Sequence, residues 1–479
     1  MRHTLLKTFI LLFSTLIYSQ AGHIMQGVSS VNMSMGGAAT GQPLDISGAL
    51  HWNPAAVSSF DGKIFSFDAG FFFSSPELSS SLPAGMLGPG APAVSGVTED
   101  DRGVSILPNL AYVWGNEESK HTWGVSAFGI SGFGVTFPEE SNNPLSPDFN
   151  PTMDSNPINY PQQAMGFGRV ESDYMLLQIG VTWAYELSDK FSVGIQPTIN
   201  FGGLELEPNP IATPSQEFGY PKSKRAWATG FGAQFGLYFD SGTGFKAGAS
   251  YKTVQSFSEF EFESTYLSGT SAPEEKFQMD YPAILSFGLG YSAGDFDLAV
   301  DYRNVNYENT EGFEKSGWTI ASSGPFMGFP NGSVEGFGWK NISVISAGVQ
   351  YKGIDKLPLR FGYTYSDNPI RDELTFFSVP ATAIIKNAFQ VGLSYEVSDN
   401  LTLDGVFHYG DSGGSSEGPL LNPTPDQDFN MDGFPDGPWN ADTNPLGIIP
   451  GSTVSYDMTT SMVMFGMSYT FSPKETSED

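Results

Sequence analysis

The sequence predicts an all-β protein, a fourteen-stranded antiparallel transmembrane β-barrel whose lumen holds the N-terminal part of the mature chain. Three observations support this fold class. Apolar and polar residues alternate through most of the chain, the connections between alternating segments are short and long in turn, and a non-alternating segment precedes the first of them. Alternation with a period of two is typical of strands that have one apolar and one polar face.

Composition excludes some classes of protein. The 479-residue chain has 52 acidic and 22 basic residues, a net charge of -30 and no cysteine. Nucleic acid is excluded as a partner, because phosphate binding needs clustered cations and the chain has no basic stripe. Disulfides and thiol chemistry are excluded by the lack of cysteine. The length fits either several soluble domains or one large barrel.

Residues 1–21 have the form of an export signal peptide. Arg2 and Lys7 are cationic, residues 9–17 are almost wholly apolar, and Ser19-Gln20-Ala21 provides a cleavage site. We therefore expect cleavage after Ala21. No later run reaches the ~20 apolar residues that a helical membrane span requires, so strands must make any crossing.

The alternation is clear in the segment from Met175 to Tyr185, where odd positions are apolar and Gln178, Gly180 and Thr182 lie between them. A second alternating segment starts at Phe191, after a short turn, so the pair is expected to form a hairpin. The same pattern predicts strands over residues 63–73, 103–114, 121–137, 172–187, 190–203, 226–239, 244–255, 276–291, 295–307, 339–351, 357–366, 384–396, 400–410 and 457–471.

The connections between these strands predict the location. Six are short turns, and seven are roughly 17 to 46 residues long and rich in Pro, Gly, Ser and Asn. This asymmetry is typical of bacterial outer-membrane barrels, which carry their long loops outside the cell. A soluble β-sandwich is the alternative, but it has no need of the aromatic residues that cluster at the strand ends, where interfacial girdles are expected. Phe471 ends the last strand and resembles the signal for the barrel-assembly machinery, although residues 472–479 follow it as a periplasmic tail.

Residues 22–62 do not alternate and are interpreted as a plug. They contain the small residues Gly36 to Gly41 and end with Asn53-Pro54-Ala55 and its flanks. Side chains alone cannot fill the lumen of fourteen strands, since eight strands already approach that limit. Asn53-Pro54 by itself is a common turn or helix start.

The mature chain resembles the FadL/TodX family of outer-membrane transporters for long-chain fatty acids and aromatic hydrocarbons. The resemblance depends on Asn53-Pro54-Ala55 after a small-residue segment, on residues 123–137, which run from Trp123 to Phe137, and on residues 360–369, which run from Arg360 to Pro369. It implies a monomeric passive transporter of hydrophobic small molecules, surrounded by outer-membrane lipid and lipopolysaccharide. It also implies that no cofactor is required and that the chain is not an enzyme.

The resemblance also implies a route for the ligand. Residues 22–62 would form a hatch in the lumen, and the third strand would kink inward and leave a gap in the wall for sideways exit into the bilayer. Gly129, Gly132 and Gly134 interrupt the alternation of that strand, and glycine in a strand marks a bend or a close approach. Barrel curvature without function is the alternative. Asp367 matches a family aspartate that faces the hatch and is assigned as its latch.

Two further sets of residues are candidate binding sites. Arg360 and Lys386 could bind a substrate carboxylate, or each could pair with a protein carboxylate, because a buried unpaired charge is costly. Asp428, Asn430, Asp432 and Asp436 fit the start of a calcium loop, with Gly433 at the turn, but the expected Glu is missing. A structural calcium ion in the last outer loop and a solvated acidic loop are the two interpretations.

Three functions remain at this point: a hydrophobic-compound transporter, a barrel enzyme such as a lipase, and a structural or adhesin barrel. Residues 22–62 favour the first, because enzyme and adhesin barrels have little need of a long hatch. The pattern does not separate fatty acids from aromatic hydrocarbons as the substrate.

Overall fold

The computed structural model describes residues 22–471, apart from residues 116–118, 216, 218, 325, 429, 430, 432 and 434. The predicted signal peptide and the predicted C-terminal tail therefore lie outside the described residues. Among those that are described, no helix is long and apolar enough to cross a membrane.

Fourteen long strands form one closed antiparallel barrel, which confirms the predicted fold class. The first strand pairs with the second over its first half and with the last strand along its whole length, so the sheet closes on itself. The barrel strands are β1 (Lys63–Leu82), β3 (Val104–Trp114), β4 (His121–Phe137), β5 (Val170–Ser188), β6 (Phe191–Glu207), β8 (Ala226–Asp240), β9 (Phe245–Lys252), β14 (Ala283–Ala293), β15 (Phe296–Asn306), β18 (Ile342–Tyr351), β19 (Leu359–Ser366), β20 (Asn387–Ser398), β21 (Leu401–Asp411) and β23 (Thr453–Phe471).

All fourteen predicted strands are present, but several boundaries differ. β1 continues to Leu82 because Glu77 to Leu82 pair with a short strand outside the barrel. The strand expected over 276–291 is divided: its first residues pair elsewhere, and β14 begins only at Ala283. Pro282 precedes that start, and proline has no N–H to donate to a sheet.

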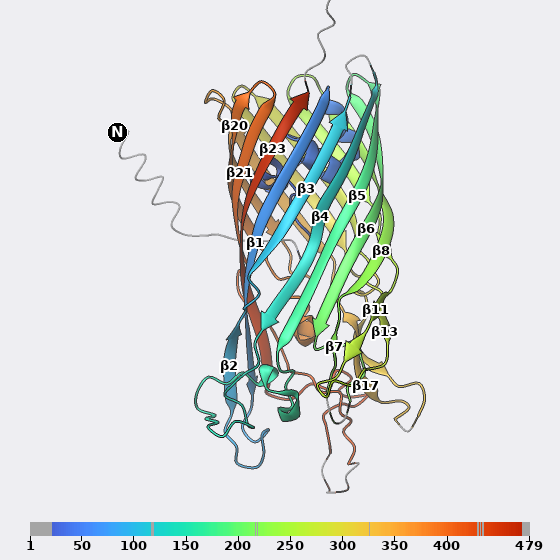
Figure 1. Cartoon of the computed structure of the whole chain (residues 1–479), viewed down its shortest axis with the longest axis vertical. Helices are drawn as coiled ribbons and strands as arrows, with labels where there is room; N and C mark the ends of the chain where they lie inside the picture. The colour runs from blue at the N-terminus through green and yellow to red at the C-terminus, as the bar shows by residue number, and fades with distance from the viewer. Residues whose placement is uncertain are drawn as a thin grey trace, which may run out of the picture.

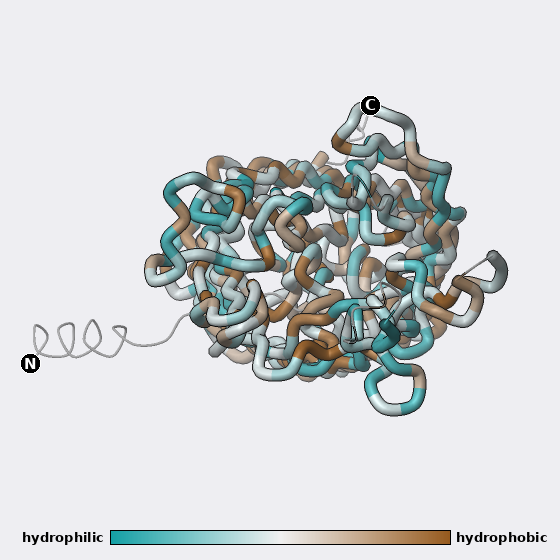
Figure 2. Tube along the Cα trace, turned by 90° about the horizontal axis from the view of Figure 1, so that it is seen from below, coloured by the Kyte–Doolittle hydropathy of each residue, from teal (hydrophilic) through white to brown (hydrophobic). Residues whose placement is uncertain are grey.

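The two ends of the barrel differ strongly (Figure 1). Short turns lie at the top of the view, and long segments with their own secondary structure lie at the bottom. Seen from that lower end, the loop segments fold over the mouth of the barrel (Figure 2). These segments contain β2 (Val94–Glu99), β7 (Lys222–Ser223), β10 (Ser256–Phe257), β11 (Phe260–Phe262), β12 (Ser264–Thr265), β13 (Glu275–Phe277), β16 (Ser316–Ile320), β17 (Pro330–Phe337), β22 (Ser416–Gly418), η2 (Pro157–Asn159), η3 (Gln162–Ala164) and η4 (Asp372–Ser378).

The wall has an apolar outside and a polar inside. In β5, Leu177 and Val181 are exposed, whereas Gln178 and Thr182 between them are buried. The outer face thus presents apolar side chains where a soluble protein would present polar ones, and a lipid bilayer is the environment that such a face requires.

The N-terminal segment, residues 22–62, lies inside the barrel near the short-turn end (Figure 1). It contains α2 (Ser30–Ser34), α3 (Ile46–Trp52) and η1 (Pro54–Ser59). Side chains start all three elements: the Ser29 hydroxyl accepts from the Asn32 N–H, Asp45 from the Gly48 N–H, and Asn53 from the Ala55 N–H. Such caps satisfy the backbone donors that a short helix leaves unpaired.

Candidate functional site

The barrel wall opens between β3 and β4. These strands pair only from Leu110 to Trp114, against Trp123 to Ala127. Beyond that point β4 continues to pair with β5 as far as Phe137, while the rest of β3 pairs with β1. The first half of β3 and the second half of β4 therefore border a lateral gap, which we call the window.

Glycines in β4 shape this window. The pairing of β4 with β5 shifts register between Gly129 and Ser131. A β-carbon at Gly132 would lie 3.0 Å from the Tyr174 carbonyl oxygen, and one at Gly134 would lie 1.7 Å from Arg102 Nη1. The bulge bends the strand, and the absence of a side chain at Gly134 lets the Arg102 guanidinium lie against the backbone.

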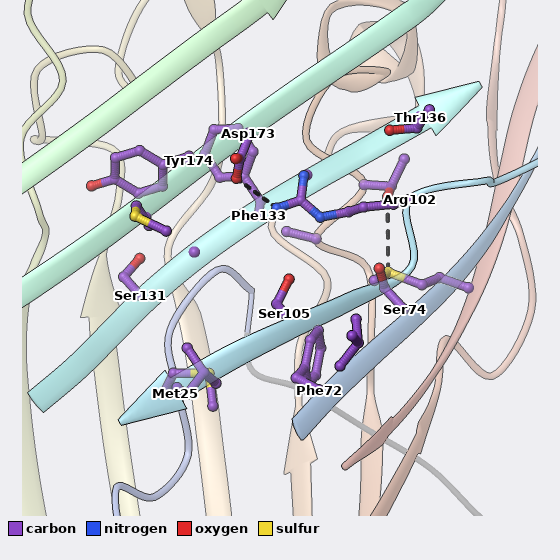
Figure 3. A pocket seen from close by; sticks show the side chains of 18 of the residues that line it. Met25, Phe72, Ser74, Arg102, Ser105, Ser131, Phe133, Thr136, Asp173 and Tyr174 are labelled. Carbon is purple, nitrogen blue, oxygen red and sulfur yellow. Dashed lines mark hydrogen bonds and ion pairs between the residues drawn. The ribbon is translucent and has the colours of Figure 1, made fainter. Parts of the chain in front are cut away.

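Contacts from the loop before β3 close the outer end of the window. Arg102 Nη1 donates to the Ser172 carbonyl oxygen at 2.6 Å, and Nη2 pairs with Asp173 Oδ1 at 2.6 Å. Figure 3 shows this side chain extending from the β3 side past β4 to β5. Asp100 Oδ1 accepts from the Thr136 N–H, and burial raises the pKa of this carboxyl above its usual range. The window is thus bounded at both ends.

A cavity of about 380 Å³ lies directly behind the window (Figure 3). β1, β3, β4 and β5 all contribute to its lining, together with two residues of the N-terminal segment, Gly22 and Met25. Phe72, Leu107, Phe133 and Tyr174 give it apolar surfaces. Arg102, Glu171 and Asp173 add a charged part, so the cavity has the size and the mixed lining of a small-molecule site and borders both the lumen and the wall.

Next to this cavity, the His23 side chain fills an aromatic cage. The cage consists of six rings with centroids 5.0 to 6.4 Å from the imidazole, and these belong to Phe133, Tyr174, Tyr281, Tyr307, Phe313 and Trp339. Two of them, Phe133 and Tyr174, also line the cavity behind the window. The cage and the cavity therefore share two side chains, and the start of the N-terminal segment borders both.

That start of the segment is hydrogen-bonded to the bulge of β4. The Met25 N–H donates to the Ile130 carbonyl at 3.0 Å, and the Gly132 N–H donates to the His23 carbonyl at 3.2 Å. The Ser131 hydroxyl also donates to the His23 carbonyl, at 3.0 Å. The inner edge of the window is thus paired with the N-terminal segment.

A buried ion pair holds the middle of the segment. Asp301 Oδ2 accepts from the N–H groups of Ala39 and Thr40, both at 2.9 Å, and pairs with Arg303 Nη2 at 2.7 Å. Arg303 also donates to the Gly37 carbonyl at 2.6 Å, and its guanidinium lies 3.6 Å from the centre of the Trp52 ring. Sequence analysis did not single out either charged residue.

The Asn53-Pro54-Ala55 turn is held against the wall. Asn53 Nδ2 donates to the carbonyl oxygens of Thr40 and of Leu237 in β8. Glycines in the wall make room for this turn: a β-carbon at Gly194 would lie 2.4 Å from the Ala55 nitrogen, and one at Gly236 would lie 2.1 Å from Asn53 Oδ1. Recurrent glycines in the middle of strands were the sequence signal for this contact.

The other predicted residues lie elsewhere. Asp367 Oδ2 accepts from the Ser343 N–H at 3.0 Å, within the wall, so its carboxylate contacts a neighbouring strand where the latch assignment expected the hatch. Arg360 is buried and donates to Gln350 Oε1 at 2.6 Å. Lys386, half-buried, precedes β20, and its backbone pairs with Ser366 and Asp411.

The calcium loop is only partly described. Asn430 and Asp432 lie outside the described residues. Asp428 Oδ2 accepts from the Gly433 N–H at 2.7 Å, and the Asp436 N–H donates to the Gln427 carbonyl at 3.0 Å. Within the described residues no group of three or more acidic or histidine side chains is placed to hold a metal ion. The calcium site stays a prediction.

Comparison with known proteins gives one family and a set of similar structures. The model of the family described as outer membrane protein transport protein (OMPP1/FadL/TodX) matches residues 159–416, more than half of the chain. No curated protein matches the sequence. The P. putida toluene transporter TodX is 15% identical with a TM-score of 0.62, covering 94% of this chain and 99% of its own. A Pseudomonas aeruginosa FadL homologue is 14% identical with a TM-score of 0.63, covering 94% and 100%. The Ralstonia pickettii toluene transporter TbuX is 15% identical with a TM-score of 0.57, covering 93% of this chain and 99% of its own.

Proposed function

Because the chain belongs to the OMPP1/FadL/TodX family of outer-membrane transport proteins, we propose that it is a passive channel that releases hydrophobic small molecules sideways through the window. The protein lies in the bacterial outer membrane, and family members are transport channels for hydrophobic compounds. Long-chain fatty acids and monoaromatic hydrocarbons are the proposed substrate classes, and no enzymatic step is needed.

The observation that carries this proposal is the cavity at the window, in which apolar side chains such as Phe72, Leu107 and Phe133 lie beside charged ones such as Arg102 and Asp173. Val104, Ile106 and Met175, which also line this cavity, are 48 to 60% exposed on the outer face of the wall. Apolar side chains therefore continue from the cavity to the outer surface. A ligand that leaves here enters lipid directly and avoids exposure to water, which costs ~0.8 kcal/mol per methylene.

The short-turn end of the lumen is unsuited to such a ligand. A cavity of about 310 Å³ there contains the charged residues Asp45, Asp68, Arg360 and Asp404 beside apolar ones such as Leu44, Ile46 and Phe60. The N-terminal segment borders this cavity through Ser29, Asp45 and Phe60, and its residues are buried in the lumen. An apolar molecule that moved straight through would have to displace the segment and cross a charged cavity, so the sideways route is favoured.

The outer loops offer a place for first capture. A small hollow among them is lined by aromatic and aliphatic residues of four loops, including Phe167, Tyr220, Trp318, Phe376 and Phe377. A second hollow next to it includes Phe133 of β4. In this proposal the ligand passes from the loops to the lumen, the N-terminal segment rearranges, and the ligand leaves at the window. The protein works as a monomer surrounded by lipid and lipopolysaccharide, after assembly by the barrel-assembly machinery.

A reversible cross-link across the window tests the proposal. The chain has no cysteine, so Leu107→Cys with Gly129→Cys gives one reactive pair; a β-carbon at Gly129 would lie 3.4 Å from Leu107 Cδ2. A short bifunctional thiol reagent with a disulfide spacer is expected to stop uptake of labelled oleate and toluene into liposomes, and reduction is expected to restore it.

The matched control joins the same strands where they are already paired. Leu110→Cys with Ala127→Cys lies in the closed part of the seam, so its cross-link should leave uptake unchanged. Normal uptake through the cross-linked window would rule out sideways exit. No uptake of either compound by the unmodified protein would rule out the transport function itself.

A further inference from the structure

We propose that the His23 imidazole occupies a binding site for small planar rings that carry a hydrogen-bonding group, such as phenols and nitrogen heteroarenes. The imidazole acts as an internal competitor that the ligand displaces. This inference rests on the proposed transport function and specifies its ligand and its gate.

The geometry of the cage is that of a ring-binding site. Phe313 stacks on the imidazole at a centroid distance of 5.0 Å and an interplanar angle of 22°. Tyr281 and Phe133 approach edge-on, at 70° and 76°. Combined stacking and edge contacts are the arrangements that aromatic rings prefer. A flexible alkyl chain gains nothing from ring orientation, so the cage favours a flat ligand.

Polar atoms in the cage distinguish it from a purely hydrocarbon site. The Tyr307 hydroxyl is hydrogen-bonded to His23 Nδ1 at 2.8 Å. His23 Nε2 and the Tyr281 hydroxyl are buried and have no hydrogen-bond partner within the described part of the chain. An unpaired buried polar group destabilises its state. A phenol can take over the bond to Tyr307 while removing the unpaired Nε2 from the cage, whereas toluene leaves the Tyr307 hydroxyl unpaired.

Displacement of His23 is coupled to the window. The His23 carbonyl accepts from the Gly132 N–H and the Ser131 hydroxyl, both at the β4 bulge. A ligand that removes the imidazole from the cage also pulls on these bonds at the inner edge of the window. The ligand binds more tightly to the state in which the imidazole has left the cage, and in that state the bonds at the window are also released. Binding therefore shifts the equilibrium toward the open window.

Two ligands that differ only in the polar group test the inference. We would measure binding of 4-fluorophenol and 4-fluorotoluene to the purified mature protein in detergent by fluorine NMR, with 1-fluorooctane as the alkyl probe. The wild type is expected to bind 4-fluorophenol most tightly. Tyr307→Phe removes one hydrogen bond from the bound phenol and one from the resident imidazole, so the preference for 4-fluorophenol over 4-fluorotoluene should fall about fivefold. His23→Ala should strengthen binding of both rings, because the competitor is gone.

Two control variants make the same kinds of substitution at positions outside the cage. Tyr395→Phe removes a hydroxyl from the outer face, where Tyr395 is 53% exposed, and His121→Ala removes an exposed imidazole at the start of β4. Neither should alter binding. An unchanged preference for 4-fluorophenol over 4-fluorotoluene in Tyr307→Phe would overturn the inference. So would unchanged or weaker ring binding in His23→Ala, or tightest binding of 1-fluorooctane by the wild type. Liposome uptake of oleate or toluene in the same preparation would show that transport itself stands.

Discussion

The buried Asp301–Arg303 pair offers a sharp test of how the N-terminal segment is held. Asp301→Asn keeps the shape of the side chain and removes its charge. The two backbone donors at Ala39 and Thr40 can still be accepted by the amide oxygen, but Arg303, which is 2% exposed, loses its counter-charge. Breaking a buried ion pair on one side costs about 3–5 kcal/mol. If that cost falls on the docked state, the undocked population rises by at least a factor of about 100.

Planar-bilayer conductance and limited proteolysis measure this change. Asp301→Asn is expected to open more often and to expose residues 22–62 to protease, while its heat-modified gel migration shows an intact barrel. Asp301→Asn with Arg303→Met should be less severe than the single change, because no uncompensated charge is left. Asp189→Asn, at an exposed turn position, is the control. Wild-type conductance in the single variant, or a double variant that is at least as leaky, would refute the reasoning.

Two other changes probe the contacts around the segment and the window. Gly236→Leu places a β-carbon 2.1 Å from Asn53 Oδ1, so we expect the docked state of the N-terminal segment to lose about 1–3 kcal/mol and the conductance to rise. Gly405→Leu, where a side chain meets open space, is the control and should behave as wild type. Wild-type conductance in Gly236→Leu would contradict this packing argument. Burial raises the pKa of Asp100, so the folded state binds the carboxyl proton more tightly than the unfolded state does. The stability that this proton contributes is therefore present at acid pH and is lost as the pH rises through the folded-state pKa. Asp100→Asn should therefore raise the unfolding temperature at pH 7 and leave it unchanged near pH 3, and a lower unfolding temperature at pH 7 would show that the carboxylate is needed at the Thr136 contact.

The barrel could be predicted because its information is local. The alternation around Gln178 and Thr182 shows which face of β5 points into the lumen, and the short turns show which strands are neighbours. Boundaries were wrong where pairing outside the barrel extends a strand, as in β1 beyond residue 73, or where Pro282 delays one. The glycines of β4 lie at and beyond a register shift between Gly129 and Ser131, but the sequence does not show which groups lie against them.

Contacts across the lumen could not be predicted, because period-two alternation gives a face and no partner. His23 and Tyr307 are 284 positions apart, and Ala39 and Asp301 are 262 apart. The aspartate that accepts from the N-terminal segment was therefore sought at Asp367, whose carboxylate accepts from Ser343 in the wall. Alternation identifies which aspartates face the lumen. It does not show which of these aspartates contacts the N-terminal segment, because the local sequence around each has the same pattern.

The contacts that hold residues 22–62 in the lumen differ in strength along the segment. The charged anchor at Asp301 and the Asn53 turn hold its middle and its end, through groups that are costly to leave unpaired. Its start, from Gly22 to Met25, is held by neutral backbone bonds to β4 and by aromatic packing around His23. Neutral hydrogen bonds contribute less net stability than bonds to a buried charge. In the proposed mechanism we therefore expect the first residues to leave the window while residues 37–55 stay docked, so that a sideways route opens without a water-filled pore through the membrane.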